Sequence, residues 1–359
     1  MKYIFGIDVG GTTIKAGLFE ESGKLLKKWS IPTRKGENGA LIYDDIAAEV
    51  TKAMAEAGIP KEDVLGVGLT MPGPVYEDGC LGACANLSVK GGDPGKEISG
   101  RLSGIPSGAE NDANAAALGE QKMGAGKGYR SLCMVTLGTG VGGGIILKGN
   151  VVVGKHGTGG EIGHIPVMDG EKEHCGCGGS GCCEQYASAT GIVRVAKRMA
   201  ANGDPMIPLD PGKACKYPES EIAKLGDSLS AKDVCDLARS GDELALRALS
   251  FSMEQLAKAL AVVAYTADPE AFLIGGGVSA AFDVLEPLLR QKLAGYTTLI
   301  DEKDLVILPA KLGNDAGICG AAHCFYHNFE INLIQPKRYS RCRKNRDRIV
   351  SETVAKEAL

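Results

Sequence analysis

The sequence lacks the features that would place the protein in a membrane or on a nucleic acid. No apolar run approaches the roughly 20 residues that a membrane-spanning helix needs. No signal peptide precedes the opening M-K-Y-I-F-G-I-D, so we expect a cytoplasmic chain. The net charge is −4, which gives no overall basic field for nucleic-acid binding. The hydrophobic content of 44% is ordinary for a soluble globular protein, and 359 residues suggest two domains.

Two residue types are abundant. Twelve cysteines would suit a disulfide framework in a secreted chain, but in a reduced compartment they favour metal binding. The 51 glycines occur in clusters, which indicates backbone turns and close approaches to a ligand.

The segment 157–184 holds the densest set of metal-ligand residues. His164 is followed by Cys175, Cys177 and Cys182 in a Gly-rich knuckle. Three thiolates and one imidazole make a complete tetrahedral zinc set. His174 is the rival fourth ligand, and a loop with free thiols is the alternative without a metal.

Two carboxylates, Glu161 and Glu184, bracket the knuckle, and Cys183 is a spare thiol. Adjacent cysteines seldom both reach one small ion, so Cys183 is excluded from the ligand set. A metal fixes nearby side chains without a hydrophobic core. We therefore interpret the segment as a polar ligand-binding loop held by structural zinc.

Two Gly-rich hairpins of one type occur in the two halves of the chain. Strands at 3–9 and 14–19 flank Gly-Gly-Thr-Thr at 10–13, with Asp8 at the end of the first strand. The stretch 131–154 repeats the pattern around Gly138, Thr139 and Gly140. Such tips can hold phosphate oxygens through backbone N–H groups, and Asp8 could hold Mg²⁺ through water. A tight hairpin without a ligand is the alternative for either tip, but the pair predicts an internal duplication.

Between the hairpins we expect a third strand at 25–33, a helix at 40–57 and a buried strand at 64–75. The stretch 76–100 is expected to be loop-rich and contains Asn86. A short strand then leads to Asn111 and Asp112, followed by an Ala-rich helix. Asp112 is either a plain helix cap or a carboxylate held at the edge of a cleft.

After the knuckle the pattern is mostly helical, at 189–200 and 231–266, with a break at 203–213. A strand over 269–279 runs into Gly275, Gly276 and Gly277 and then into a helix. This junction is typical of a nucleotide site, although it could also be a simple helix start. A last strand at 305–310 and a last helix at 314–326 follow. Residues 329–359 are rich in Lys and Arg, and we expect a disordered tail there.

Six motifs occur in the order seen in the ROK family of repressors, open reading frames and kinases, which this chain resembles over about residues 3–326. They are D-V-G-G-T-T-I-K, E-N-D-A-N-A-A-A-L-G-E, L-G-T-G-V-G-G-G-I, G-E-I-G-H-I-P-V, C-G-C-G-G-S-G-C-C-E and L-I-G-G-G-V-S. Within the family, Q-Y-A-S-A-T-G-I-V-R-V-A-K at 185–197 is similar to the glucokinases of Gram-positive bacteria.

The resemblance implies an α/β protein with the actin-like ATPase (sugar kinase) fold. Two α/β domains would flank a cleft, with the zinc knuckle in the C-terminal domain. Residues 1–117 would form the small N-terminal domain, joined by the helix near 314–327, and residues 118–313 the larger one.

The resemblance also assigns roles to residues. Sugar contacts would come from Asn86, Asn111, Asp112, Glu161, His164 and Glu184. ATP and Mg²⁺ would be held by Asp8, Gly10, Gly11, Thr12, Thr13, Lys15, Gly138, Thr139, Gly140, Gly275, Gly276 and Gly277. Zinc would be held by His164, Cys175, Cys177 and Cys182.

The resemblance implies phosphoryl transfer from ATP to the 6-hydroxyl of a hexose, with D-glucose as the favoured substrate. That reaction needs a group to accept the hydroxyl proton, and Asp112 is the family-matched carboxylate for this role. The two glutamates would recognise neighbouring hydroxyls. Because the phosphate loops lie elsewhere in the sequence, we expect loss of zinc to affect ATP binding much less than sugar binding.

Several alternatives remain at this stage. After Asn86 the chain has Leu87-Ser88-Val89 where the family would have Leu-Gly-Trp, so N-acetylmannosamine, N-acetylglucosamine or fructose could replace glucose. A sugar-responsive repressor would carry a helix-turn-helix segment before the first loop, for which we expect no room ahead of Asp8. Family members are commonly homodimers or homotetramers, and neither a nucleic acid nor a membrane is expected as a partner.

Overall fold

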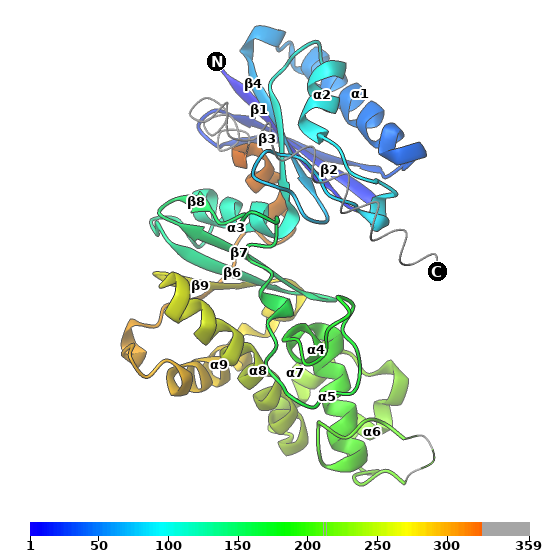
Figure 1. Ribbon diagram of the computed structural model, residues 1–359, viewed down its shortest axis with the longest axis vertical. Coiled ribbons are helices and arrows are strands. Elements are labelled where there is room, and N and C mark those ends of the chain that lie inside the picture. Colours follow the sequence, from blue (N-terminus) through cyan, green and yellow to red (C-terminus); the bar gives the residue numbers. More distant parts are fainter. Residues whose placement is uncertain (211, 213, 325–359) are drawn as a thin grey trace.

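The computed structural model describes residues 1–210, 212 and 214–324, and it contains two mixed five-stranded sheets (Figure 1). The first sheet has the order β3-β2-β1-β4-β5. Its strands are β1 (Tyr3–Val9), β2 (Thr13–Glu20), β3 (Leu25–Pro32), β4 (Val64–Met71) and β5 (Ser107–Asn111). The second sheet has the order β10-β9-β6-β7-β8. Its strands are β6 (Leu132–Leu137), β7 (Val141–Leu147), β8 (Asn150–Val151), β9 (Ala271–Gly275) and β10 (Ile307–Pro309).

The two sheets share one topology, which confirms the internal duplication. In the first, β1, β2 and β3 form an antiparallel meander, and β4 and β5 add in parallel to β1. In the second, β6, β7 and β8 form the meander, and β9 and β10 add in parallel to β6. Because the parallel strands of each sheet run the same way, their carboxyl ends meet at one edge. The Gly-rich tips lie at these edges.

Alternation along β1 sends its side chains to two different cores. Phe5 and Ile7 pack in the core with α1 (Ala40–Ala57), while Ile4 packs with Ile318 on the other face. The sheet therefore has a helix on each face. The helix on the second face, at 316–324, comes from the C-terminal part of the described chain, as Figure 1 shows in orange.

Glycines let this helix lie directly on the sheet. A Cβ on Gly6 would lie 2.1 Å from the carbonyl oxygen of Ile318, and one on Gly68 would lie 1.7 Å from that of Ala321. Gly6 and Gly68 are register partners on β1 and β4. Two glycines side by side thus make the flat patch that the helix backbone needs.

The helix at 316–324 also contacts α3 (Asp112–Met123), the helix that follows β5. A Cβ on Gly119 would lie 2.6 Å from the carbonyl oxygen of Ala316, and one on Gly320 would lie 1.7 Å from that of Ala115. On its other side α3 packs against β7 of the second sheet. The chain therefore passes between the sheets through two segments that touch each other.

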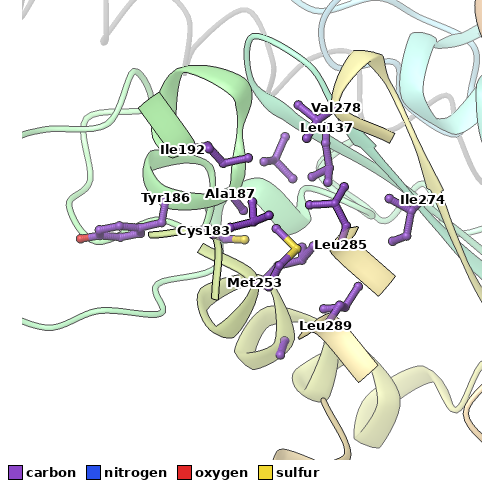
Figure 2. Packing of buried hydrophobic residues seen from close by; sticks show 14 of the residues in the cluster. Leu137, Cys183, Tyr186, Ala187, Ile192, Met253, Ile274, Val278, Leu285 and Leu289 are labelled. Carbon is purple, nitrogen blue, oxygen red and sulfur yellow. The ribbon is translucent and has the colours of Figure 1, made fainter. Parts of the chain in front are cut away.

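The second sheet is covered by a larger helical core. It includes α5 (Ala189–Asn202), α7 (Ala231–Arg239), α8 (Glu243–Ala267) and α9 (Phe282–Tyr296), with the short α4 (Glu184–Ala187) and α6 (Glu221–Leu225) at its side. Figure 2 shows part of this core, where Leu137 and Ile274 meet Met253 and Leu285. No helix within the described ranges is long and apolar enough to span a bilayer.

Three expectations need correction. The loop-rich stretch 76–100 contains most of a helix, α2 (Pro94–Arg101), which Asp93 caps by accepting the Lys96 N–H at 3.0 Å. The helical stretch 231–266 is broken at Gly241, whose φ of +91° suits glycine. The region of the predicted break after 203 is followed by α6, which the sequence analysis did not identify.

Two expectations stay untested. The division at residues 117 and 118 falls inside α3, which is continuous, and it remains a prediction. The basic segment 329–359 lies outside the described residues.

The packing of α3 on the helix at 316–324 can be tested with one methyl group. Gly320→Ala would place Cβ against the Ala115 carbonyl, and we expect it to lower the free energy of unfolding by about 1–3 kcal/mol. Gly295→Ala in α9 is the control, because its Cβ would meet no atom within 4 Å. Urea denaturation of both variants measures the difference. Equal stability of the two variants would contradict the close packing.

Candidate functional site

The first Gly-rich tip lies where β1, β4 and β5 end. Asp8 is near the end of β1, and its Oδ1 accepts a hydrogen bond from the Thr70 hydroxyl of β4 at 2.7 Å. Its Oδ2 lies 3.5 Å from the Lys15 Nζ of β2. Gly317 packs directly against the carboxylate, since a Cβ there would be 2.7 Å from Cγ of Asp8. Asp8 is therefore held from three sides.

The tip itself is closed by backbone bonds. Gly10 donates its N–H to the Thr13 carbonyl at 3.0 Å, and Thr33 binds the carbonyls of Gly10 and Thr12 through its hydroxyl and its N–H. Among the described residues, the N–H groups of Gly11 and Thr12 have no acceptor. Two adjacent free N–H groups are suited to an anion.

The second tip is built in the same way. Gly138 donates its N–H to the Gly140 carbonyl at 3.0 Å, and the N–H groups of Thr139 and Gly140 meet no acceptor within the described chain. A Cβ on Gly276 would lie 2.4 Å from the carbonyl of Leu137, just before this tip, and its φ is +82°. The third Gly-rich segment, 275–277, thus packs against the base of the second tip.

The residues that follow β5 form a tightly bonded start to α3. Asn111 accepts the N–H groups of Ala113 and Asn114 with Oδ1, and its Nδ2 donates to the Gly73 carbonyl and to Asp112 Oδ1, each at 3.0 Å. Asp112 Oδ1 also accepts the Ala113 N–H at 2.9 Å. These bonds to Asp112 reach one oxygen, so neither occupies Oδ2.

Asp112 is an exposed residue, yet protein atoms surround its carboxyl closely enough to alter its pKa. Desolvation raises the pKa of Asp112 above the ordinary value, the negative charges of Asp8 and Glu161 raise it further, and the Ala113 N–H opposes the change. Asp8 and Glu161 are therefore near enough to Asp112 to repel its charge. A cation or hydroxyl donors near these carboxylates would offset the repulsion.

The predicted metal ligands come together. One ligand atom from each of His164, Cys175, Cys177 and Cys182 lies within 4.8 Å of the other three. The sulfurs of Cys177 and Cys182 are 3.7 Å apart, and Cys175 Sγ is 3.7 Å from His164 Nδ1. A tetrahedral zinc site with its usual bond lengths needs S–S and S–N separations of about 3.6–3.8 Å. The donor set and its spacing therefore fit a zinc ion.

The rival residues lie elsewhere. His174 Nδ1 pairs with the Ser180 hydroxyl at 3.2 Å, outside the cluster. Cys183 points into the core beside Tyr186 and Ala187 (Figure 2), where it is fully buried. The preference for His164 over His174, and the exclusion of Cys183, agree with the geometry.

Both flanking glutamates touch the cluster. Glu161 Oε2 lies 3.8 Å from His164 Nε2, and Glu184 Oε1 lies 3.8 Å from Cys175 Sγ. Glu184 Oε2 accepts the Val141 N–H at 2.9 Å, just after the second tip. The cluster thus joins the surroundings of Asp112 to the second hairpin.

A buried ion pair anchors the segment before the first cysteine. Arg198 of α5 donates to both oxygens of Glu171, at 2.9 and 3.3 Å, and Tyr186 donates to the same carboxylate at 2.9 Å. Burial alone would raise the pKa of Glu171, but the Arg198 guanidinium and the other donors lower it to about 2. The knuckle is therefore fastened to α5 by a buried polar network.

Asn86 is not joined to the rest of the predicted site. It is exposed in a 3-10 turn at Ala85–Leu87, and its carbonyl lies 3.9 Å from where a Cβ of Gly11 would be. The turn is thus beside the first tip, but within the described part of the chain the Asn86 side chain makes no hydrogen bond to Asp112. Sequence reasoning missed Thr70, Thr190 and Arg198, which hold functional groups in place. Each is a common residue type outside any Gly- or Cys-rich pattern, so the sequence offered no signal for them.

The comparisons with known proteins agree with this geometry. The model of the ROK family matches residues 4–327. The chain belongs to the ROK family. It is 38% identical over 325 residues to a glucokinase of Halalkalibacterium halodurans, covering 89% of this chain and 93% of the relative.

Solved ROK structures share the fold. A glucokinase from Streptomyces griseus, crystallised with glucose and AMPPNP, is 33% identical with a TM-score of 0.67, over 90% of this chain and 98% of that one. A ROK transcriptional regulator, a homologue of the Escherichia coli MLC protein, is 26% identical with a TM-score of 0.76, over 92% and 80%. Since kinases and regulators of the ROK family share one architecture, the function has to be argued from the site.

The metal site makes a direct prediction. Cys177→Ser should release the metal, since one of four ligands is lost, whereas His174→Ala and Cys183→Ala should keep one metal per chain. Elemental analysis of protein purified without chelator measures this. Absence of zinc in the unaltered protein would refute the site, and loss of zinc in His174→Ala would mean that the fourth ligand is misassigned.

Proposed function

We propose that this protein is an ATP-dependent glucokinase, which transfers the γ-phosphoryl group of ATP to the 6-hydroxyl of D-glucose with Asp112 as general base. One observation carries the proposal. A series of contacts runs from the second tip through Glu184, Cys175 and His164 to Glu161. The charges of Glu161 and of Asp8, which lies beside the first tip, both act on Asp112. The surroundings of both tips are thereby linked to the proposed base.

The two tips suit the nucleotide. Free N–H groups at 11–12 and at 139–140 can bind phosphate oxygens, and Gly275, Gly276 and Gly277 beside the second tip would adjoin the adenosine. Asp8 and Lys15 would stand at the phosphates, with Asp8 as the carboxylate that holds Mg²⁺ through water. When bound, Mg²⁺ offsets the charge that develops on the phosphates.

The base role suits Asp112 for two reasons. Its Oδ1 is fixed by two N–H donors, which aims the other oxygen, and its raised pKa increases its affinity for the hydroxyl proton. Asn111 uses its amide fully within the protein, so we assign it to positioning Asp112 as well as to the sugar pocket.

Sugar recognition would come from Glu161, His164, Glu184 and the turn of Asn86. Carboxylates accept paired hydroxyls and so discriminate between sugars. The chain departs from the family pattern at Ser88 and Val89. Val89 is buried in the first core together with Leu87, whereas Ser88 is exposed like Asn86. Val89 therefore anchors the turn, and Asn86 and Ser88 remain as the groups that could meet a sugar.

A panel of sugars tests the proposal. ADP release should be fastest with glucose when glucose, mannose, fructose, N-acetylglucosamine and N-acetylmannosamine are compared by kcat/KM. The 34–38% identity to four bacterial glucokinases supports this order. A higher kcat/KM with an N-acetyl sugar would assign that sugar as the substrate in place of glucose. No ADP release with any of these sugars would refute the kinase assignment.

The base is tested by Asp112→Asn. The amide keeps the shape but cannot accept the proton, so we expect kcat to fall about 10²–10⁴-fold while the glucose Kd changes little. Because the Asp112 pKa is raised, the unaltered enzyme should lose kcat/KM as the pH falls through a value above the ordinary carboxyl range, when Asp112 becomes protonated.

Asp227→Asn is the matched control, because that carboxylate is fully exposed and, among the described residues, forms an ion pair with Lys197 alone. Its kcat should equal that of the unaltered enzyme. An Asp112→Asn variant that keeps more than half of the original kcat would remove Asp112 from the base role.

A further inference from the structure

The segment 184–190 connects the metal cluster to the second Gly-rich tip. It begins two residues after Cys182 and contains α4 and the start of α5. It is hydrogen-bonded to residues 138, 139 and 141 around this tip.

Three bonds join the segment to the tip. Glu184 Oε2 accepts the Val141 N–H at 2.9 Å, Ala189 donates its N–H to the Gly138 carbonyl at 2.8 Å, and the Thr190 hydroxyl donates to the Thr139 carbonyl at 2.9 Å. The carbonyls of Gly138 and Thr139 are thus both occupied. With these carbonyls turned to the segment, the N–H groups at 139 and 140 are free to face a ligand.

The same segment is bound to the metal ligands. Glu184 Oε1 lies 3.8 Å from Cys175 Sγ, and Gln185 exchanges hydrogen bonds with the backbone of Cys182, at 3.1 and 3.0 Å. Gly140 packs on Glu184 so closely that a Cβ would lie 2.2 Å from Oε2. Cys183, Tyr186 and Ala187 fix the other side of α4 in the core (Figure 2).

Segment 184–190 is short, packs on one side against the close-packed core and is hydrogen-bonded at both ends. A displacement at one end is therefore transmitted to the other. If the metal is lost, the cysteines are no longer fixed to one another, and the position of Glu184 and the residues after it is less well defined. The tip at 138–140 then loses the bonds that orient its N–H groups.

We propose that segment 184–190 couples the metal site to nucleotide binding, with Thr190 as a positioning residue for the second phosphate loop. The inference rests on the proposed function, in which that loop binds ATP. It revises the expectation that metal loss would affect ATP binding much less than sugar binding, because the loop is distant from the knuckle in sequence but bonded to it in space.

Coupling of this kind is reciprocal, so it can be measured from the metal side. If the metal favours nucleotide binding, the nucleotide must tighten metal binding by the same factor. Zinc affinity is measured at equilibrium against a chromogenic chelator, with and without saturating AMPPNP and Mg²⁺. We expect AMPPNP to raise the zinc affinity about 5-fold or more. An unchanged zinc affinity would overturn the coupling.

Thr190→Val removes one of the three bonds and keeps the shape of the side chain. We expect its Kd for AMPPNP, measured by calorimetry, to rise about 3- to 10-fold. The glucose Kd should stay unchanged, and Thr190→Ser should restore nucleotide binding. Thr266→Val on α8 is the matched control, since within the described chain its hydroxyl bonds to carbonyls of its own helix and to no other group.

The outcomes separate this inference from the proposed function. A protein that phosphorylates glucose and binds AMPPNP, but in which Thr190→Val leaves the nucleotide Kd unchanged, refutes the role of Thr190 alone. A protein that binds no AMPPNP refutes the proposed function with it. An equal rise of both the glucose and the nucleotide Kd would mark Thr190 as a general structural residue and would also overturn the assignment.

Discussion

The buried carboxylate of Glu120 fixes the relative position of the two sheets. Its Oε1 accepts the N–H groups of Lys311 and Leu312 at 2.8 and 2.6 Å, and its Oε2 accepts the Ala125 N–H at 2.7 Å. These donors lie after α3 and after β10, at the two places where the chain passes between the sheets. A buried carboxylate without a cation is costly unless N–H groups satisfy it, so the two crossings are held where they can donate to it. Distances across the site depend on this arrangement, because Asp8 lies on β1 of the first sheet and Asp112 begins α3. The metal cluster is joined to β7 of the second sheet through Glu184.

Features that lie within a short stretch of sequence could be predicted, whereas contacts between distant parts of the chain could not. The metal ligands, the two Gly-rich tips and the N-terminal start of α3 each lie within a short stretch whose residue types already limit the backbone. The sequence therefore predicted His164 with the three cysteines and the duplicated hairpins. Thr190 and Glu120 act through carbonyls and N–H groups that are 51 and 191 residues away, so no local pattern could reveal them. The helix α2 was missed because one proline and two glycines stand among its eight residues, although Pro94 lies where a helix tolerates proline.

The knuckle has two supports of different physical kinds. On one side Arg198 and Glu171 form a buried pair, and breaking such a pair leaves an uncompensated charge that costs about 3–5 kcal/mol. On the other side Cys183 and Tyr186 pack in the apolar core below α4. The four metal ligands lie within 4.8 Å of one another on the loop that these supports anchor, and a bound metal would fix them to one another. This explains how a loop so rich in glycine can hold Glu161 and Glu184 in defined positions.

Opposing interactions act on the pKa of the Asp112 carboxyl. Its N–H donors and its place at the start of α3 favour the ionised form. Desolvation and the charges of Asp8 and Glu161 favour the neutral form, and they prevail, because its pKa lies above the ordinary value. A carboxylate left with higher proton affinity is a better proton acceptor once it is ionised. Part of this repulsion comes from Asp8, which lies near the end of β1, and part from Glu161. A ROK regulator shares this fold, so the two sheets alone cannot establish a kinase activity, and the proposed catalysis has to rest on the acidic groups around Asp112.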